Sequence, residues 1–368
     1  MPPLLRTTRV VYGAVMAQRD TSGPLRRGWT TGACATAATR SALCALLTGT
    51  FEDPVTIILP KGERPSFPLA SERLGNGWAE AAIVKDAGDD PDVTHGATVR
   101  ARVSFGGTGV SFRAGKGVGM VTKPGLPVAV GEPAINPVPR AMMRAEVERV
   151  CLAHGRRPDV RITIGIDDGE TIAARTWHPR LGIVGGLSVL GTTGVVRPFS
   201  CAAWIHSIHR GVDVARATNE PRIVAATGST SEAAALRLRP VPETAVIDMG
   251  DFAGGLLKYL RAHPVPRVTI AGGFAKLTKL AQGSLDLHSG RSQVDTDRLA
   301  QWVAPALAPL VRDANTAAQV LEIAGPAGIA EEVARRAHAV ASDTLRGAAV
   351  ELEVIVVDRA GEVVAVHG

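Results

Sequence analysis

The chain has 368 residues, of which 45% are hydrophobic and 21% charged, a composition that excludes global disorder. Its four cysteines are scattered without a C-x-x-C pair, which excludes a disulfide framework or zinc knuckle and favours a reducing cytoplasm. Lys and Arg outnumber Asp and Glu by 41 to 35, but the basic residues are dispersed and only 4% of residues are aromatic, so this charge favours a soluble polyanion over nucleic acid.

Residues 1–24 are predicted to form a loose extension. Arg6 and Arg9, with the apolar stretch after them, resemble a secretory signal only faintly, because that stretch is short and no small-x-small cleavage site follows. No run approaches the roughly 18 to 20 apolar residues that cross a bilayer, and the clearest helices are rich in alanine rather than amphipathic in the manner of membrane-surface helices. We therefore expect a cytoplasmic protein without a membrane partner.

The first half of the chain is predicted to mix helices and strands. Alanines and leucines recur at helical spacing after Thr30-Thr31, one of which can cap a helix start, and before Gly49, which can end one. A second, amphipathic helix is predicted over residues 140–155. Alternating or apolar runs bounded by Gly, Pro or Asp predict strands over residues 54–60, 77–86, 98–105 and 161–166. Residues 1–215 are therefore predicted to form a mixed α+β domain.

The second half is more regular, because three units of strand, turn and helix follow one another over residues 222–238, 245–263 and 268–283. Such alternation predicts a parallel sheet with right-handed crossovers, which brings the three turns together at its carboxyl edge. A late helix is predicted over 330–345 and a hairpin over 350–366. The predicted fold class is α/β, with a Rossmann-like domain over 216–347 and a C-terminal hairpin, 348–368, assigned to neither domain.

The turns of this predicted sheet hold a candidate cofactor site. In Rossmann-like folds a Gly-rich turn meets a helix N-terminus, and an acid about 20 residues further on holds ribose hydroxyls. Gly228-Ser229-Thr230 and Asp248 have this relation, so S-adenosylmethionine or a nucleotide could bind there; a plain turn with a capping hydroxyl explains the same pattern. Lys276 could meet a substrate carboxylate or be a solvated residue of a first helical turn. The candidate cofactor residues are Gly228, Ser229, Thr230, Asp248, Gly250, Gly272 and Gly273.

A dense acidic loop follows the predicted strand over 77–86. Its acidic and imidazole side chains are Asp86, Asp89, Asp90, Asp92 and His95. Three interpretations are open. The loop could bind a cation, although it lacks the spaced ligands of an EF-hand. Its side chains could serve as acid/base groups, because neighbouring carboxylates drive their pKa values apart, or they could form Asx turns that cap backbone N–H groups. The candidate acid/base residues are Asp90 and His95.

Glycine-rich segments occur at 106–109, 115–119, 121–140 and 178–200, and basic residues such as Lys116, Lys123 and Arg140 lie in or near them. Open backbone N–H groups beside Lys and Arg can form anion-binding nests, and arginine binds carboxylates bidentately. None of these segments has the GK[ST] spacing of a Walker A loop. His206 and His209 have i,i+3 spacing but no evident third ligand, so we expect no resident metal. The candidate residues for an anionic substrate are Lys116, Lys123, Arg140, Arg180, Thr192, Thr193, Arg197 and Lys276.

Several of these motifs are long and distinctive, and they occur in a fixed order. They include LRRGWTTGACATAA, KDAGDDPDVTHGA, GKGVGMVTKPGL, VGEPAINPVPR, HPRLGIVGGLSVLGTTG, GDFAGGLL and KLTKLAQG. Through them the chain resembles, over about residues 24–358, the cobalt-precorrin-5B methyltransferase family of cobalamin biosynthesis, the CbiD family. It departs from that family at 272–276, where the resemblance leads us to expect Gly-His-x-Gly-Lys, and at 178–180, where we expect Asn-Pro-Arg.

The resemblance implies an enzyme that transfers a methyl group from S-adenosylmethionine to carbon 1 of cobalt-precorrin-5B and gives cobalt-precorrin-6A. Such a reaction needs two substrates held in line rather than a catalytic triad. The corrinoid is an anionic partner through its acetate and propionate side chains, and cobalt enters only as part of this substrate. We expect S-adenosylmethionine at the carboxyl edge of the second domain and the macrocycle beside residues 116–140 and 180–197. Asp90 or His95 would accept a proton.

Two other functions are open from the residues alone. One is a phosphoryl-transfer enzyme, in which the Gly-rich segments hold nucleotide phosphates and the acidic loop holds Mg²⁺. The other is a non-catalytic corrinoid-binding protein, which needs the basic surface but not the turns of the parallel sheet. The sequence is also compatible with a homo-oligomer.

Overall fold

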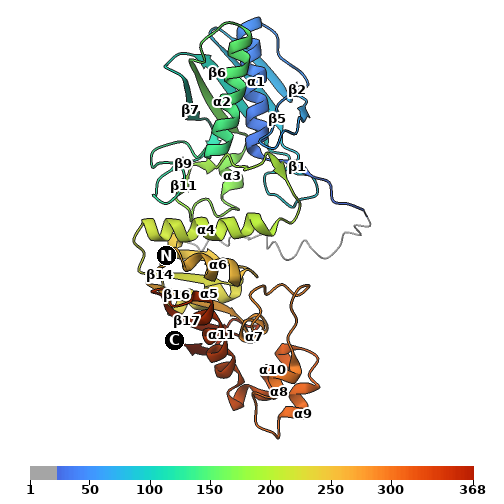
Figure 1. Ribbon diagram of the computed structural model, residues 1–368, viewed down its shortest axis with the longest axis vertical. Coiled ribbons are helices and arrows are strands. Elements are labelled where there is room, and N and C mark those ends of the chain that lie inside the picture. Colours follow the sequence, from blue (N-terminus) through green and yellow to red (C-terminus); the bar gives the residue numbers. More distant parts are fainter. Residues whose placement is uncertain (1–22) are drawn as a thin grey trace, which may run out of the picture. The chain divides into compact units, whose positions relative to one another are not determined.

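The computed structural model describes residues 23–368, so the predicted extension over 1–24 lies almost entirely outside the described part. The chain forms two compact units, with the boundary between Ser200 and Cys201 (Figure 1). The predicted boundary at residue 215 instead falls inside helix α4 (Cys201–Ala217), which belongs to the second unit. Each unit combines helices with a five-stranded sheet, which confirms the α/β fold class. Among residues 23–368, no helix has the length and apolar character that a membrane crossing requires.

The first unit is built on a sheet of strand order β4-β5-β6-β10-β7. Its strands are β4 (Ser71–Gly75), β5 (Trp78–Val84), β6 (Thr98–Phe105), β10 (Val160–Ile166) and β7 (Val110–Ala114). Neighbouring strands are antiparallel except β10 and β7, which are parallel. Because side chains alternate along a strand, β6 buries Val99, Ala101 and Val103 on one face and carries Arg100 and Arg102 on the other.

Helices α1 (Thr31–Thr48) and α2 (Pro137–Ala153) pack against each other and cover one face of this sheet (Figure 1). As predicted, Thr30 caps α1, since its side chain accepts the Ala33 N–H at 3.2 Å. Gly49 ends the helix in the left-handed conformation, at φ 80°, where a side chain would be strained. The alanines of α1 are small, so this helix lies close to the strands and fills the core with them.

Pairs of two-residue strands join separate segments of the first unit, most of them rich in glycine. β1 (Gly28–Trp29) pairs with β13 (Val195–Val196), β8 (Gly117–Val118) with β12 (Gly186–Leu187), β9 (Met120–Val121) with β11 (Ile183–Val184), and β2 (Val55–Thr56) with β3 (Ser66–Phe67). Helix α3 (Gly169–Ala173) contacts β8 and β12. The predicted strand over 54–60 has only two paired residues, Val55 and Thr56. Beyond them the Ile57 and Leu59 N–H groups donate to the carbonyls of Pro65 and Glu63, and Pro65 has no N–H to return.

The second unit contains the predicted parallel sheet. Its strands are β15 (Val246–Asp248), β14 (Arg222–Ala226), β16 (Arg267–Gly273), β17 (Glu351–Val357) and β18 (Val363–His367), in that spatial order. All pairs are parallel except β17 and β18, so the C-terminal hairpin completes this sheet. Numbered within the unit, the order is 2-1-3-4-5. In doubly-wound sheets of this order the ligand site lies where the direction of strand addition reverses, here between the carboxyl ends of β14 and β16.

Helices pack on both faces of this second sheet. Helix α5 (Ser229–Leu238) covers one face together with a small apolar cluster. The larger core on the other face involves α4, α6 (Ala253–Leu260), α7 (Phe274–Ala281) and α11 (Ile329–Leu345). The remaining helices are α8 (Thr296–Ala300), α9 (Ala308–Arg312) and α10 (Ala317–Ala324), with 3-10 turns at Glu243–Ala245 and Gly325–Ala327.

Candidate functional site

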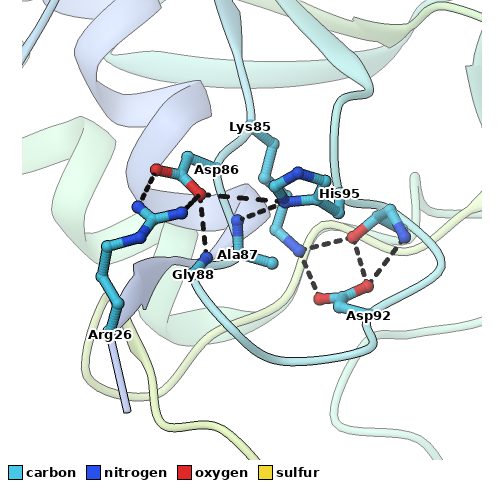
Figure 2. A network of polar contacts seen from close by, with 8 residues as sticks. Arg26, Lys85, Asp86, Ala87, Gly88, Asp92 and His95 are labelled. Carbon is cyan, nitrogen blue, oxygen red and sulfur yellow. Dashed lines mark hydrogen bonds and ion pairs between the residues drawn. The ribbon is translucent and has the colours of Figure 1, made fainter. Parts of the chain in front are cut away.

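The acidic loop is folded around a buried lysine (Figure 2). Lys85 follows β5, its side chain is only 2% exposed, and its ammonium contacts Asp92 and the Thr94 hydroxyl. Asp92 also accepts the Thr94 N–H at 2.8 Å and the Thr94 hydroxyl at 2.6 Å. Burial alone would raise the pKa of Asp92, but the Lys85 charge and these hydrogen bonds hold it below its ordinary value. One side of the loop is therefore fixed by an internal ion pair.

The other side of the loop is fixed by Arg26, which precedes β1. Its guanidinium forms two bonds with Asp86, and the pKa of this carboxyl is lowered chiefly by that contact. The Arg26 backbone N–H donates to Asp89 at 2.7 Å, and Asp86 also accepts the Gly88 N–H at 2.9 Å. These contacts favour the interpretation of the loop as a set of Asx turns. Among residues 23–368, no three His, Cys, Asp or Glu side chains are arranged to hold a metal ion.

Asp90 and His95, the predicted acid/base pair, occupy different parts of this loop. Asp90 accepts the backbone N–H of Phe199 at 2.8 Å, and burial raises its pKa above the ordinary value of 3.8. His95 Nδ1 accepts the Ala87 N–H at 3.0 Å, so a neutral His95 ring carries its proton on Nε2, and its side chain is 54% exposed. Asp90 is thus a half-buried carboxyl with a raised proton affinity, which is the property that a proton acceptor needs.

Four motifs of the first unit meet at the N-terminus of α1. The Trp29 N–H donates to the Asp86 carbonyl at 2.7 Å, the Gly32 N–H to the Leu190 carbonyl at 3.0 Å, and the Asn136 N–H, before α2, to the Val189 carbonyl at 2.9 Å. The acidic loop, both helix starts and the 188–194 segment are therefore joined by backbone hydrogen bonds. Sequence reasoning did not predict this meeting.

Gly191 shows how close this approach is. Its φ is 138°, and a Cβ placed there would lie 2.3 Å from the Thr30 hydroxyl oxygen. Only glycine therefore lets the GTTG turn approach the cap of α1.

His178 fixes the segment that precedes this turn. Thr176 donates its hydroxyl proton to the Ala173 carbonyl, so His178 Nδ1 must be the donor in its 2.7 Å contact with Thr176. His178 Nε2 then accepts from the Ser188 hydroxyl, also at 2.7 Å. Burial lowers the pKa of His178 to about 4, so the ring is neutral at physiological pH. The histidine at this departure from the family pattern therefore acts as a neutral link between two hydrogen-bonding hydroxyls.

Several of the predicted substrate residues are engaged in contacts within the protein. The Arg140 guanidinium binds the carbonyls of Ile135 and Pro133 at 2.8 and 2.9 Å and pairs with Glu132 at 3.1 Å, so it holds the turn before α2. Arg180 is also engaged in a contact of its own, and the Thr193 hydroxyl bonds to the Val195 backbone at 3.3 Å.

Of the other predicted substrate residues in this unit, Lys123, Thr192 and Arg197 are exposed. Lys116 lines a cavity beside strands β6 and β10, together with Arg100 and Arg102.

The carboxyl edge of the second sheet brings its three turns together, as predicted. Lys276, in the first turn of α7, donates to the Thr227 carbonyl after β14 at 2.8 Å and pairs with Asp251 after β15 at 3.0 Å. It is therefore neither a free anion site nor a purely solvated residue. Sequence reasoning missed Asp251, although this acid directly follows Gly250 in the GDF motif and could have been found as a partner for a lysine at the same edge.

Asp248 and Gly250 form a tight turn at this edge. The Asp248 carboxylate accepts the Gly250 N–H at 3.2 Å, and the Trp204 indole donates to the Asp248 carbonyl at 3.2 Å. Gly250 has φ 54° and packs against Trp204. A Cβ on Gly250 would lie 3.0 Å from the nearest atom of the Trp204 ring. The contact to the Gly250 N–H is an Asx turn, so the predicted ribose-binding acid also has a local structural role.

Two glycines leave room for a ligand above this edge. A Cβ on Gly228 or on Gly273 would meet nothing within 4 Å, whereas one on Gly272 would lie 3.0 Å from Leu277 and Thr227. Gly228 and Gly273 precede α5 and α7, which follow β14 and β16. They flank the point where the strand order reverses, and they expose backbone there to a ligand. Ser229 and Thr230 are exposed in the first turn of α5.

Comparisons with known proteins agree with this arrangement of motifs. The CbiD family model matches residues 18–198, and the model described as CbiD, C-terminal domain, matches residues 286–368. Curated proteins named cobalt-precorrin-5B C(1)-methyltransferase from Brucella anthropi and Brucella canis are each 61% identical over 350 residues, which is 93% of this chain and 95% of theirs.

A crystal structure of a cobalamin biosynthesis protein (cbiD) from Archaeoglobus fulgidus is 27% identical, with a TM-score of 0.39, over 73% of this chain and 83% of that one. The names of the curated relatives favour neither phosphoryl transfer nor a non-catalytic corrinoid-binding protein. Two matching family models and 61% identity over nearly the whole length leave one assignment: the chain belongs to the CbiD family.

Proposed function

We propose that this chain is an S-adenosylmethionine-dependent methyltransferase that methylates carbon 1 of cobalt-precorrin-5B and gives cobalt-precorrin-6A. The observation that carries the proposal is the 61% identity, over 93% of the chain, to proteins named for methylation of this carbon. Identity of that extent covers nearly the whole chain, so the likeness is more than one of fold alone. The product, the methyl donor and the placement of each substrate go beyond those names.

The proposed donor site is the carboxyl edge of the second sheet. Gly228 and Gly273 offer open backbone there, and space lies where their Cβ atoms would stand. Asp248, at the end of the adjacent strand β15, is the acid available to ribose hydroxyls. The Lys276–Asp251 pair and the Lys276 bond to Thr227 hold the three turns rigidly, which keeps the donor in a fixed orientation.

When bound, S-adenosylmethionine supplies an activated methyl group whose carbon–sulfur bond breaks with both electrons remaining on sulfur. The ring carbon of the corrinoid provides the electron pair of the new carbon–carbon bond. The residues of this chain align the two groups and accept any proton released by the macrocycle. Asp90 is our candidate acceptor, because burial raises its pKa while the Phe199 N–H keeps the carboxylate oriented.

A substitution at Gly273 tests the donor site. Gly273 has φ −64° and ψ 148°, which any residue adopts, and a Cβ there meets no protein atom, so Gly273→Val should fold normally. The added side chain would occupy the space proposed for the donor. Titration calorimetry with S-adenosylhomocysteine should therefore show binding to the wild type and at least about tenfold weaker binding to the variant.

Ala262→Val is the matched control, because Ala262 is exposed beyond the far end of α6. It should leave donor affinity unchanged. Equal binding by Gly273→Val and the wild type would place the donor elsewhere. A wild type that binds ATP with Mg²⁺ but neither S-adenosylmethionine nor its product would reject methyl transfer itself.

A further inference from the structure

Among residues 23–200, no helix packs on one face of the five-stranded sheet, since α1 and α2 both pack on the other face (Figure 1). Directly opposite residues share a face of a sheet, so the register of the strands defines what this open face carries. One row across the sheet reads Arg73, Glu80, Arg102, Thr163 and Arg113. The row on one side of it reads Ser71, Ala82, Arg100 and Gly165, and the row on the other side includes Ser104 and Arg161. The open face is therefore polar and predominantly basic.

A cavity of about 340 Å³ lies on this face. Arg100, Arg102 and Lys116 contribute its cations, and Glu80 and Asp167 contribute its carboxylates. Gly165, directly opposite Arg100, also lines the cavity, and a Cβ there would lie 3.2 Å from the Lys116 carbonyl oxygen, so glycine allows the Lys116 backbone to approach β10 closely.

Two arginines of the cavity are held in place. Arg100 binds Asp167 through two nitrogens at 2.7 Å each and the Ser71 hydroxyl at 3.0 Å. The Asp167 bonds are the main reason that the pKa of Arg100 is raised and that of Asp167 lowered. Arg102 binds Glu80 at 3.0 and 2.9 Å, and its guanidinium carbon lies 4.2 Å from the centre of the Trp78 ring. These contacts fix the cavity wall and leave little of its charge uncompensated.

The other cations of this face have no such partner. Within residues 23–368, the side chains of Lys116, Arg73, Arg113 and Arg161 form no hydrogen bond or ion pair. Lys116 and Arg73 are near enough to Asp167 to lower its pKa, but that carboxylate is already bound by Arg100. The two carboxylates at the cavity, Glu80 and Asp167, are already bound by Arg102 and Arg100, so they do not balance these four cations. Here the unpartnered cations create a local positive field that an anionic ligand would relieve.

The width of the basic face indicates a ligand with several carboxylates. Arg73 lies on β4 and Arg113 on β7, at opposite edges of the five strands. At about 4.8 Å between neighbouring strands, the face is roughly 19 Å wide. A single carboxylate cannot contact cations spread over this distance, whereas a polycarboxylate can.

We propose that the open face of this sheet binds the peripheral carboxylates of the corrinoid, with one side arm in the cavity against Lys116 and others toward Arg113 and Arg161. This inference rests on the proposed function, which supplies a ligand with many carboxylates. It adds a binding surface made of residues that, apart from Lys116, no sequence motif indicated.

The test measures corrinoid binding without a methyl donor. The probe is cobyrinic acid, a stable cobalt corrinoid with free carboxylic side chains, and its full methyl ester is the uncharged control. Lys116→Ala, Arg113→Ala and Arg161→Ala should each weaken cobyrinic acid binding about threefold, and the triple variant about thirtyfold. Arg64→Ala is the matched control, because Arg64 is an exposed arginine on the loop between β2 and β3, away from this face, and it should bind as the wild type does. Added salt should weaken cobyrinic acid binding by the wild type and leave the ester unaffected.

Three results would overturn the inference: equal affinity of the ester and the acid, unchanged affinity of the triple variant, or a single-stranded oligonucleotide that binds this face more tightly than cobyrinic acid. The ester and salt experiments use the wild-type chain, so they test the inference even if the triple variant fails to fold.

A methyl-transfer assay separates this inference from the proposed function. If the wild type transfers the methyl group while the triple variant keeps its corrinoid affinity, only the inference fails; a wild type without transfer removes the proposed function.

Discussion

Replacement of His178 by asparagine should make the stability of the protein less dependent on pH. The folded chain holds this ring neutral, with a pKa of about 4 instead of 6.5. Between these two values the unfolded chain binds a proton that the folded chain does not, so the free energy of unfolding falls as the pH is lowered through this window and levels off below it. At about 1.4 kcal/mol for each pH unit, the expected loss from this residue is about 3 kcal/mol.

The cause of this loss lies in the contacts of the ring. Nδ1 donates to Thr176 and Nε2 accepts from Ser188, so a proton added to Nε2 would replace an acceptor with a second donor and break the bond from Ser188. It would also place a charge in a site sheltered from water. Asparagine carries no titratable proton, and its amide offers both a donor and an acceptor to the two hydroxyls.

Urea unfolding followed by circular dichroism at a series of pH values between 7 and 4 measures this effect. Subtracting the variant's unfolding free energy from that of the wild type removes the contribution of all other titrating groups. His154→Asn, at an exposed histidine beyond α2, is the control and should follow the wild type. Parallel pH profiles for the wild type and His178→Asn would refute the assignment of a neutral, buried His178.

Three further outcomes follow from the first unit. Lys85→Met should lower the free energy of unfolding by about 3–5 kcal/mol, because it leaves Asp92 without its ion-pair partner; adding Asp92→Asn should recover part of this loss in thermal melts. Asp90→Asn should slow single-turnover methyl transfer at least about tenfold while leaving KM for both substrates unchanged, and an unaltered rate would reject Asp90 as the proton acceptor. Gly49→Ala should lower the free energy of unfolding, measured by chemical denaturation, by about 1 kcal/mol, because alanine is strained at φ 80°. Thr48→Ala at the neighbouring residue tests whether any substitution at this helix end has the same effect.

Local patterns predicted the parts of the fold that depend on neighbouring residues. The caps of α1 and the strand–turn–helix units of the second half follow from short-range chemistry, and the meeting of three turns at one sheet edge follows from the handedness of crossovers. The roles of charged side chains were harder to predict. Arg140 looked available to a substrate, but its long side chain returns to carbonyls of the preceding turn, a contact that composition and spacing do not reveal.

Long-range pairing explains the other differences. Asp86 is paired by Arg26, sixty residues earlier in the chain, and the basic open face is assembled from four strands whose register is fixed only in the folded sheet. Each arginine of that face is an ordinary outward residue of an alternating strand when read alone. The sequence-based prediction included Lys116 because it stands in a glycine-rich motif, and it did not include Arg113 and Arg161 because they do not.

The hydrogen bonds that tie the start of α1 to the GTTG segment have a consequence for folding order. Thr30 and Gly32 receive their partners, the carbonyls of Gly194 and Leu190, from the far end of the first unit. During synthesis α1 therefore emerges long before the chain that completes its N-terminal surroundings. Loop closure over such a distance is slow, so the helix and its neighbouring strands can condense first while the junction of the four motifs forms last. The hydrogen bonds that join the start of α1 to the GTTG segment thus form only when almost the whole unit is present.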